Sequence, residues 1–323
     1  MFTCYRPNFI YDGGYMRKKL LVIGCGYLGY HIANYSYNNK LDITVIGRTS
    51  DYVMRLNKNV RFIEAEISEA TTLLSQELDS NTIVVYAVGS INATNSFDDL
   101  AEDLMDTYLP FVKLLNICAE NNVKKFVFLS SAGTVYGDSH ENLSETHCLQ
   151  PINIYGLQKV YFENLLKIKN IESNLPYLVL RISNPYGGYQ SPRKKQGIIP
   201  ILFQKAAKGE ILNLWTDINT TRDYIYIDDF MEIFARLVTY NENDVINIGS
   251  GMGTSLAEVI GIIENVTGKK IEIQFNTKLN MLNIKSNVLN ISKMTRVTHF
   301  ESITPIDKGI FKTYQEYYEK EWV

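Results

Sequence analysis

One short glycine motif constrains this chain more than any other feature of its sequence. Residues 19–24 form an almost continuous apolar run, KLLVIG, which is followed by Gly24-Cys25-Gly26-Tyr27-Leu28-Gly29 and then by a helical stretch at 30–38. This is G-x-G-x-x-G between a strand and a helix, where glycines let backbone N–H groups approach a pyrophosphate at the positive end of the helix. We therefore expect Gly24, Gly26 and Gly29, with Tyr27 and Leu28 between them, to bind a dinucleotide.

Further apolar runs alternate with helical stretches along the first half of the chain. The runs with the composition of strands buried on both faces are 19–24, 43–46, 60–63, 82–87, 125–129 and 177–182. This alternation is typical of an α/β fold with a doubly wound parallel sheet. We expect a dinucleotide-binding Rossmann domain over residues 17–187, with helices that include 100–122 and 160–168.

The remainder of the chain, 188–323, has a mixed pattern that predicts a smaller α/β lobe for the substrate. Its expected helices are 198–208, ending at Gly209, then 256–266, capped by Thr254 or Ser255, and a terminal helix at 305–320. Its expected strands are 211–215, 222–227, 245–248 and 271–275. The chain is expected to cross back to the first domain once or twice. We interpret residues 1–16 as an extension of minor importance, because Met16 directly precedes a basic triplet and the first strand.

The composition excludes several classes of protein. The chain has 323 residues and a formal net charge of −3, and it is 46% hydrophobic and 21% charged. These values are ordinary for a globular protein and exclude a basic nucleic-acid-binding surface, and no apolar run is long enough to span a membrane. The four cysteines match no zinc site, so we expect reduced thiols, no metal and a cytoplasmic protein.

The end of the second predicted strand indicates which dinucleotide binds. A site for NAD usually places an acidic residue there to hold the ribose hydroxyls, but the sequence reads Val45-Ile46-Gly47-Arg48. Arg48 can pair with a 2′-phosphate and stack on adenine, which favours NADP(H). The nearby Asp51 keeps NAD(H) open. After the third strand, Glu66 and Ile67 are expected to contact the adenine.

A candidate catalytic pair lies in the second half of the first domain. Tyr155-Gly156-Leu157-Gln158-Lys159 is a Y-x-x-x-K motif, which on a helix places the phenol and the ammonium on one face. A neighbouring positive charge lowers the pKa of a phenol, so Tyr155 could exchange a proton with a sugar hydroxyl while a hydride moves. Tyr155 and Lys159 are the predicted catalytic residues.

A strand ending in small hydroxyl residues supplies two more candidates. Residues 126–137 read FVFLSSAGTVYG, and their hydroxyls fall at the carboxyl edge of the predicted sheet, where open α/β folds bind ligands. Ser131 and Thr134 can donate a hydrogen bond to a hydroxyl or ketone oxygen. We count them with the catalytic residues.

Together with 180–187 (LRISNPYG), 222–229 (RDYIYIDD) and 247–251 (NIGSG), these motifs resemble those of extended short-chain dehydrogenases/reductases of the nucleotide-sugar epimerase/dehydratase superfamily. The resemblance implies that Tyr155 is the acid/base and that Lys159 binds the nicotinamide ribose. It implies that Asn184 and Arg222 contact the sugar diphosphate and that residues 197–200 lie near the nucleotide. An alternative for Arg222 is an ion pair with Asp223, Asp228 or Asp229. A homodimer through the helices of 100–122 and of Tyr155 is also implied.

Four departures from the superfamily pattern narrow the choice of reaction. Ile23 replaces the first glycine of the usual loop, and Ala132 replaces the usual catalytic serine. The acidic pair of sugar 4,6-dehydratases aligns with Gly133 and Thr134, so elimination of water lacks its acid and base and a dehydratase is rejected. A second phosphate-binding arginine is missing between 278 and 285, where Lys278 or Lys285 could replace it.

These residues favour an NADP(H)-dependent reductase of a 4-keto nucleotide sugar, with a dTDP-4-dehydro-6-deoxyhexose as the expected substrate. The main alternative is an NAD-dependent 4-epimerase of a UDP-hexose or UDP-N-acetylhexosamine. The resemblance places either enzyme in the biosynthesis of a surface polysaccharide such as O-antigen. A non-catalytic nucleotide sensor on the same fold is a third hypothesis, against which the intact Tyr155 and Lys159 argue.

Overall fold

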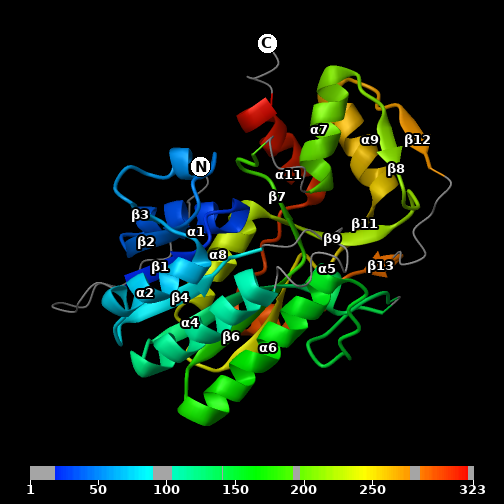
Figure 1. Cartoon of the computed structure of the whole chain (residues 1–323). Helices are drawn as coiled ribbons and strands as arrows, with labels where there is room; N and C mark the ends of the chain where they lie inside the picture. Colours follow the sequence, from blue (N-terminus) through cyan, green and yellow to red (C-terminus); the bar gives the residue numbers. More distant parts are fainter. Residues whose placement is uncertain (1–18, 90–103, 140, 192–196, 277–283, 319–323) are drawn as a thin grey trace.

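The fold is built around one large parallel sheet (Figure 1). The computed structural model describes residues 19–89, 104–139, 141–191, 197–276 and 284–318. Seven strands pair in the order β10-β6-β5-β4-β1-β2-β3. Their bounds are β1 (Lys19–Ile23), β2 (Asp42–Gly47), β3 (Arg61–Glu64), β4 (Thr82–Tyr86), β5 (Lys125–Ser131), β6 (Tyr177–Ile182) and β10 (Asp244–Ile248). The doubly wound α/β fold predicted from the sequence is confirmed.

Both faces of this sheet are covered by helices, which explains why its strands are apolar throughout. In β1, Leu20 and Val22 pack into one core and Leu21 and Ile23 into the other. The first core lies under α1 (Tyr27–Asn38), α8 (Ile227–Leu237) and α10 (Ser292–Thr298), and the second under α2 (Ile67–Glu77), α4 (Leu109–Glu120) and α6 (Ile154–Ser173). Successive strand residues point to opposite faces, so every position needs an apolar side chain.

The smaller lobe combines short strands with three helices. Its strands are β7 (Asn184–Tyr186), β8 (Leu212–Leu214), β9 (Thr221–Tyr226), β11 (Gly253–Ser255), β12 (Ile273–Phe275) and β13 (Ser286–Asn287). β9 is central, because β7, β11 and β13 all pair with it, while β8 and β12 form a separate parallel pair. The helices are α7 (Ile198–Lys208), α9 (Leu256–Thr267) and α11 (Ile306–Thr313).

The chain returns from the smaller lobe to the large sheet. β10 pairs in parallel with β6, from Asp244 opposite Leu178 to Ile248 opposite Ile182. Residues 188–323 therefore contribute to both lobes. A boundary at residue 187 does not separate the two lobes in space, because β10 belongs to the large sheet. The return places the carboxyl ends of β6 and β10 beside the smaller lobe, where a substrate would meet the cofactor.

Several element boundaries differ from the prediction. α6 begins at Ile154 rather than near 160, because the Asn153 side chain caps it by accepting from Gly156 N at 2.8 Å. α8 was not predicted, although two acidic residues in its first turn are a helix-start signal. Of the expected 100–122 helix, residues 104–108 form a π turn before α4, and 100–103 lie outside the described residues. Residues 314–318 form a π turn after α11.

Two predicted helix boundaries of the smaller lobe are confirmed. Gly209 ends α7 with φ 63°, and Ser255 caps α9 in a reciprocal capping box with Glu258. Short helical turns complete the fold at Val53–Arg55 and at α5 (Ala132–Val135). No helix in the described ranges is long and apolar enough to cross a bilayer.

Candidate active site

The glycine loop forms an open cradle at the start of α1. Gly24 has φ 101°, and a Cβ atom there would lie 3.0 Å from the Ala87 carbonyl. A Cβ atom on Gly29 would lie 2.0 Å from the Gly24 carbonyl oxygen, so only glycine lets α1 begin against the loop. Beyond its chain neighbours, Gly26 has no atom within 4 Å of its Cβ position, and the first turn of α1 carries no acidic residue. The cradle therefore fits the pyrophosphate of a dinucleotide.

Around Arg48 the charges are mixed rather than purely basic. The Arg48 guanidinium Nε lies 3.9 Å from the Glu66 carboxylate, and both side chains are mostly exposed. Thr49, the next residue, donates a hydrogen bond to Glu64. A 2′-phosphate at Arg48 would have to replace Glu66 and lie near a second carboxylate. Glu66 and Ile67 stand at the start of α2, and Glu66 lies beside Arg48. Their contact with adenine stays a prediction.

Lys159 lies at the carboxyl ends of two central strands. Its ammonium donates to the carbonyl oxygen of Leu129 at 3.0 Å and to that of Val88 at 3.4 Å. The same nitrogen lies 5.3 Å from the centre of the Tyr155 ring. Val88 also packs on the glycine loop, with its Cγ2 3.1 Å from the position of a Gly24 Cβ. One residue thus joins the predicted catalytic lysine to the predicted dinucleotide loop.

Burial, rather than the neighbouring charge, dominates the ionisation of this pair. It raises the pKa of Tyr155 to about 12, and it lowers the pKa of Lys159 to about 7 against the opposing effect of the Glu163 carboxylate. The expected lowering of the Tyr155 pKa is therefore wrong for the protein without ligands. The physical reason is that burial removes the hydration of the phenolate. This loss of free energy exceeds the electrostatic stabilisation from an ammonium that lies 5.3 Å from the ring centre.

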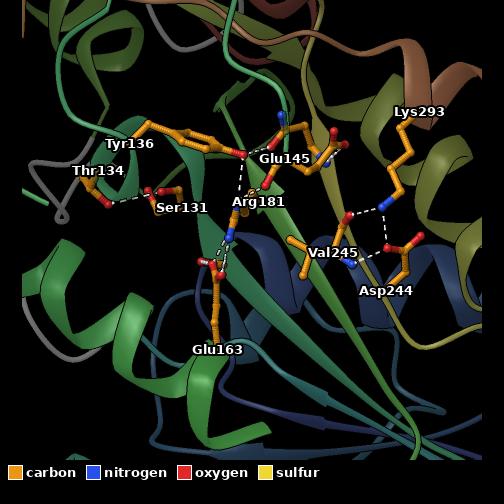
Figure 2. Close-up of polar contacts among 11 residues, drawn as sticks. Ser131, Thr134, Tyr136, Glu145, Glu163, Arg181, Asp244, Val245 and Lys293 are labelled. Atoms are coloured by element: carbon orange, nitrogen blue, oxygen red, sulfur yellow. Dashed lines mark hydrogen bonds and ion pairs between the residues drawn. The ribbon is translucent and has the colours of Figure 1, made fainter. Parts of the chain in front are cut away.

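Ser131 and Thr134 lie directly beside the start of α6. The Thr134 hydroxyl donates to the Ser131 carbonyl oxygen at 3.3 Å (Figure 2). A Cβ atom on Gly156 would lie only 2.4 Å from the Thr134 carbonyl oxygen. Because Gly156 follows Tyr155 in the chain, this close approach brings the two predicted catalytic segments together. Ala132, at the place of the usual serine, is fully buried and contributes no hydroxyl.

Two walls from different parts of the chain enclose a cavity of about 260 Å³. Tyr27 and Tyr52 come from the cofactor domain, and the other residues follow β6 or belong to the smaller lobe. The lining is Tyr27, Tyr52, Ser183, Asn184, Pro185, Tyr186, Gln190, Ser191, Gly197, Ile198, Ile199, Pro200 and Tyr224. Asn184 and residues 197–200, predicted for the substrate, therefore border the same space.

Arg222 is half-buried on β9 and makes no ion pair with a carboxylate within the described ranges, although the lowering of its pKa by burial is partly offset by the charge of Asp138. Its guanidinium donates to the carbonyl oxygen of Thr221 at 2.9 Å, and burial lowers its pKa. The proposed alternative partners are occupied elsewhere: Asp223 accepts from Ser250 and the backbone of Gly251 and Leu289, Asp228 from Lys312, and Asp229 from Thr304. An unpaired, partly desolvated guanidinium is suited to bind a phosphate.

The other three substrate candidates differ in position. The Asn184 amide donates to the Asp223 carbonyl oxygen at 2.7 Å, which fixes it next to β9. Lys285 is exposed, and its backbone N–H donates to Asp138. Lys278 lies outside the described residues. The replacement of a second arginine by a lysine stays a prediction.

A buried ion pair between α6 and β6 was not predicted from the sequence. The Arg181 guanidinium donates to Glu163 at 2.7 Å, and both side chains are at most 3% exposed. Figure 2 shows Arg181 reaching from Glu163 to Tyr136, whose hydroxyl accepts from Arg181 at 2.8 Å. Ser130 also donates to Glu163, at 2.6 Å. The signal was an arginine inside an apolar strand run, since such a charge requires a buried partner.

Comparisons with known proteins identify the family of the chain. The model of the NAD dependent epimerase/dehydratase family matches residues 20–249. A dTDP-4-dehydro-6-deoxyglucose reductase of Escherichia coli is 33% identical over 71% of this chain and 72% of its own length. The crystal structure of the Thermotoga maritima UDP-glucose 4-epimerase with UDP-glucose has a TM-score of 0.87 at 26% identity, over 94% of this chain and 100% of that one. That of the Thermus thermophilus UDP-glucose 4-epimerase with NAD has a TM-score of 0.83 at 25% identity, over 92% and 98%.

Proposed function

The chain belongs to the NAD dependent epimerase/dehydratase family, and from this premise we propose that it is a nucleotide-sugar 4-epimerase that works with NAD. The observation that carries the hydride-transfer chemistry, which a 4-epimerase shares with a reductase, is the position of Lys159. Its ammonium is bound at the ends of β4 and β5 by Val88 and Leu129, and Val88 also packs against the dinucleotide loop. The two solved structures described above, from Thermotoga maritima and Thermus thermophilus, match nearly the whole chain and are both UDP-glucose 4-epimerases, which supports this reaction.

The chain's own residues have distinct tasks in this reaction. Tyr155 takes the proton of the C4 hydroxyl and returns it to the ketone oxygen, while Thr134 or Ser131 hydrogen-bonds that oxygen. Arg222 and Asn184 hold the diphosphate, so that the sugar can turn over between the two hydride transfers. The glycine loop would hold the pyrophosphate of NAD, and Lys159 its nicotinamide ribose. Bound NAD would supply the acceptor for the C4 hydride, and its positive charge would lower the pKa of Tyr155.

The charges around Arg48 favour NAD over NADP. The exposed Arg48–Glu66 pair contributes about 0–1 kcal/mol at most, so it could be broken, but the carboxylates of Glu66 and Glu64 would then repel a 2′-phosphate. The ribose hydroxyls of NAD can instead donate to those carboxylates. The structure of the Thermus thermophilus epimerase with NAD supports the same choice.

A reductase of a 4-keto nucleotide sugar is the second candidate. The Escherichia coli dTDP-4-dehydro-6-deoxyglucose reductase, at 33% identity, favours it. Both candidates use the same Tyr155 and Lys159, because each moves a hydride and a proton at C4. They differ in the source of the hydride. In the epimerase the hydride leaves C4 of the sugar and returns to it, whereas in the reductase it comes from NADPH.

One experiment separates the two reactions. The purified protein is incubated with UDP-hexoses and UDP-N-acetylhexosamines, and the products are followed by NMR and by the absorbance of the reduced cofactor. We expect interconversion of two 4-epimers with no net absorbance change. Consumption of NADPH that occurs only with a 4-keto sugar would establish the reductase instead. Mass spectrometry of the cofactor carried through purification gives an independent result.

A further inference from the structure

The segment 187–191 lies between the cofactor domain and the substrate cavity, and it is bound at several points to the former. The hydroxyl of Tyr27, at the start of α1, donates to the Gly187 carbonyl oxygen at 2.7 Å. The Tyr189 carbonyl oxygen lies 3.2 Å from His31 Nε2, and the guanidinium of Arg55 lies 3.8 Å from the centre of the Tyr189 ring. Each of these partners belongs to the cofactor domain, so the segment is attached to that domain at several points.

The last residue of this segment makes the most specific contacts. Ser191 is 3% exposed and lines the cavity. Its backbone N–H donates to the Tyr52 hydroxyl at 3.0 Å, and its side chain donates to the Asp51 carboxylate at 2.6 Å. Loss of the carboxylate would leave a buried hydroxyl without this strong acceptor, which costs free energy. Ser191 is therefore held by two consecutive residues of one loop.

That loop follows β2, and the end of this strand is where a Rossmann fold usually holds the ribose of the cofactor. Asp51 is the acidic residue of this loop, three positions after Arg48. By residue type alone, Asp51 could hold the ribose hydroxyls. The structure gives its Oδ2 a different partner, a serine in the wall of the substrate cavity. Glu64 and Glu66 remain as carboxylates beside Arg48.

We propose that Asp51 is a positioning residue for the substrate cavity, which acts through Ser191 and fixes the wall that receives the nucleotide sugar. This inference rests on the proposed function, because it takes the cavity to be the nucleotide-sugar site. Asp51 is not among the residues that line the cavity, whereas Ser191 is. A small displacement of the cavity wall should lower the affinity for the nucleotide sugar strongly. Loss of the Asp51 carboxylate should therefore change the binding of the substrate and leave the binding of the cofactor unchanged.

The test compares Asp51→Asn, Ser191→Ala and the double variant, each loaded with NAD, by calorimetric titration with UDP and with dTDP as probes. We expect each single substitution to raise the Kd of the bound probe about tenfold, as loss of a hydrogen bond to a charged group does. The double variant should bind no more weakly than Ser191→Ala alone, because both substitutions act on the same contact: Ser191→Ala removes its donor, and Asp51→Asn removes the charge of its acceptor. Tyr52→Phe removes the acceptor of the Ser191 N–H. It should raise the Kd of the probe in addition to the effect of Asp51→Asn, because it acts on a different hydrogen bond.

Two readouts separate this role from a merely structural one or from ribose binding. The NAD content should stay at the wild-type level in all variants, and kcat should change far less than KM. Asp42→Asn, at the exposed opposite end of β2, is the matched control and should change neither Kd. Additive losses in the double variant, or an Asp51→Asn protein that loses NAD and keeps its UDP affinity, would overturn the inference. A wild-type protein that binds neither UDP nor dTDP would overturn the proposed function, and this inference with it.

Discussion

The ammonium of Lys159 lies 5.3 Å from the centre of the Tyr155 ring, but its hydrogen bonds go to the carbonyl oxygens of Leu129 and Val88. The backbone of the sheet therefore fixes the lysine before any ligand arrives. A buried cation of this kind is held at a cost in stability, as the lowered pKa of Lys159 shows. The same burial keeps the phenol neutral until further positive charge enters the site.

Replacing Lys159 by Met should abolish activity and stabilise the fold. The Lys159 pKa is about 7 in the folded protein against 10.5 ordinarily, so the unfolded chain binds more protons between these values. The destabilisation is therefore complete below pH 7 and disappears as the pH rises towards 10.5. We expect Lys159→Met to gain about 0.5–2 kcal/mol at pH 6 and less at pH 9. Urea unfolding at both pH values measures this, and a variant less stable at pH 6 would contradict it.

Stability should fall in acid through His31. Burial lowers the pKa of His31 to about 4, so the folded protein keeps the imidazole neutral while the unfolded chain protonates near pH 6.5. The wild type should lose up to about 3 kcal/mol through this group as the pH falls from 6.5 to 4. His31→Gln should show a shallower decline over this range in urea unfolding, and equal slopes would refute the assignment.

Removing one partner of the Arg181–Glu163 pair should lower the free energy of unfolding more than replacing both partners by apolar residues. Glu163→Gln leaves a buried guanidinium without its counter-charge, which should cost about 3–5 kcal/mol in the free energy of unfolding. The double variant Glu163→Leu with Arg181→Met removes both charges and should lose clearly less. Equilibrium unfolding of the three proteins decides the point. If the double variant were the least stable, the ion pair would be a net contributor to the fold.

Association should depend on the outer face of α6. Leu157, Tyr161, Ile168 and Ile171 are exposed apolar residues on this helix, with Ile171 82% exposed. Their spacing places them along one side of the helix, as in a helix that packs against a partner. We predict a homodimer in analytical ultracentrifugation and a monomer for Ile168→Glu. The control is Met54→Glu, an exposed apolar residue away from α6, which should remain dimeric. A monomeric wild type would refute the prediction.

The sequence predicted the sheet well because its signals are local. A strand buried on both faces must be apolar, and the glycine loop needs small residues at fixed positions, so both patterns are visible in one segment. Gly29 is the clearest case, since any side chain there would overlap the Gly24 carbonyl oxygen. Tyr155 and Lys159 share a helix, so their spacing was also informative.

What the sequence did not predict depends on contacts between distant segments. Asp51 and Ser191 are 140 residues apart, and Glu163 and Arg181 belong to different elements. Burial is equally non-local: the shift of the Tyr155 pKa to about 12 comes from desolvation by the surrounding fold, while the sequence showed only the nearby lysine. Such effects follow from tertiary packing and not from spacing.

The central claim is that the Tyr155 hydroxyl moves the proton at C4, and Tyr155→Phe tests it most directly. The measurement is the rate of epimerisation of a UDP-hexose by this variant, with NAD content and UDP affinity determined on the same sample. We predict a rate at least about 10²-fold lower, with cofactor and UDP bound as in the wild type. A variant that retains both ligands and still epimerises at the wild-type rate would contradict the account.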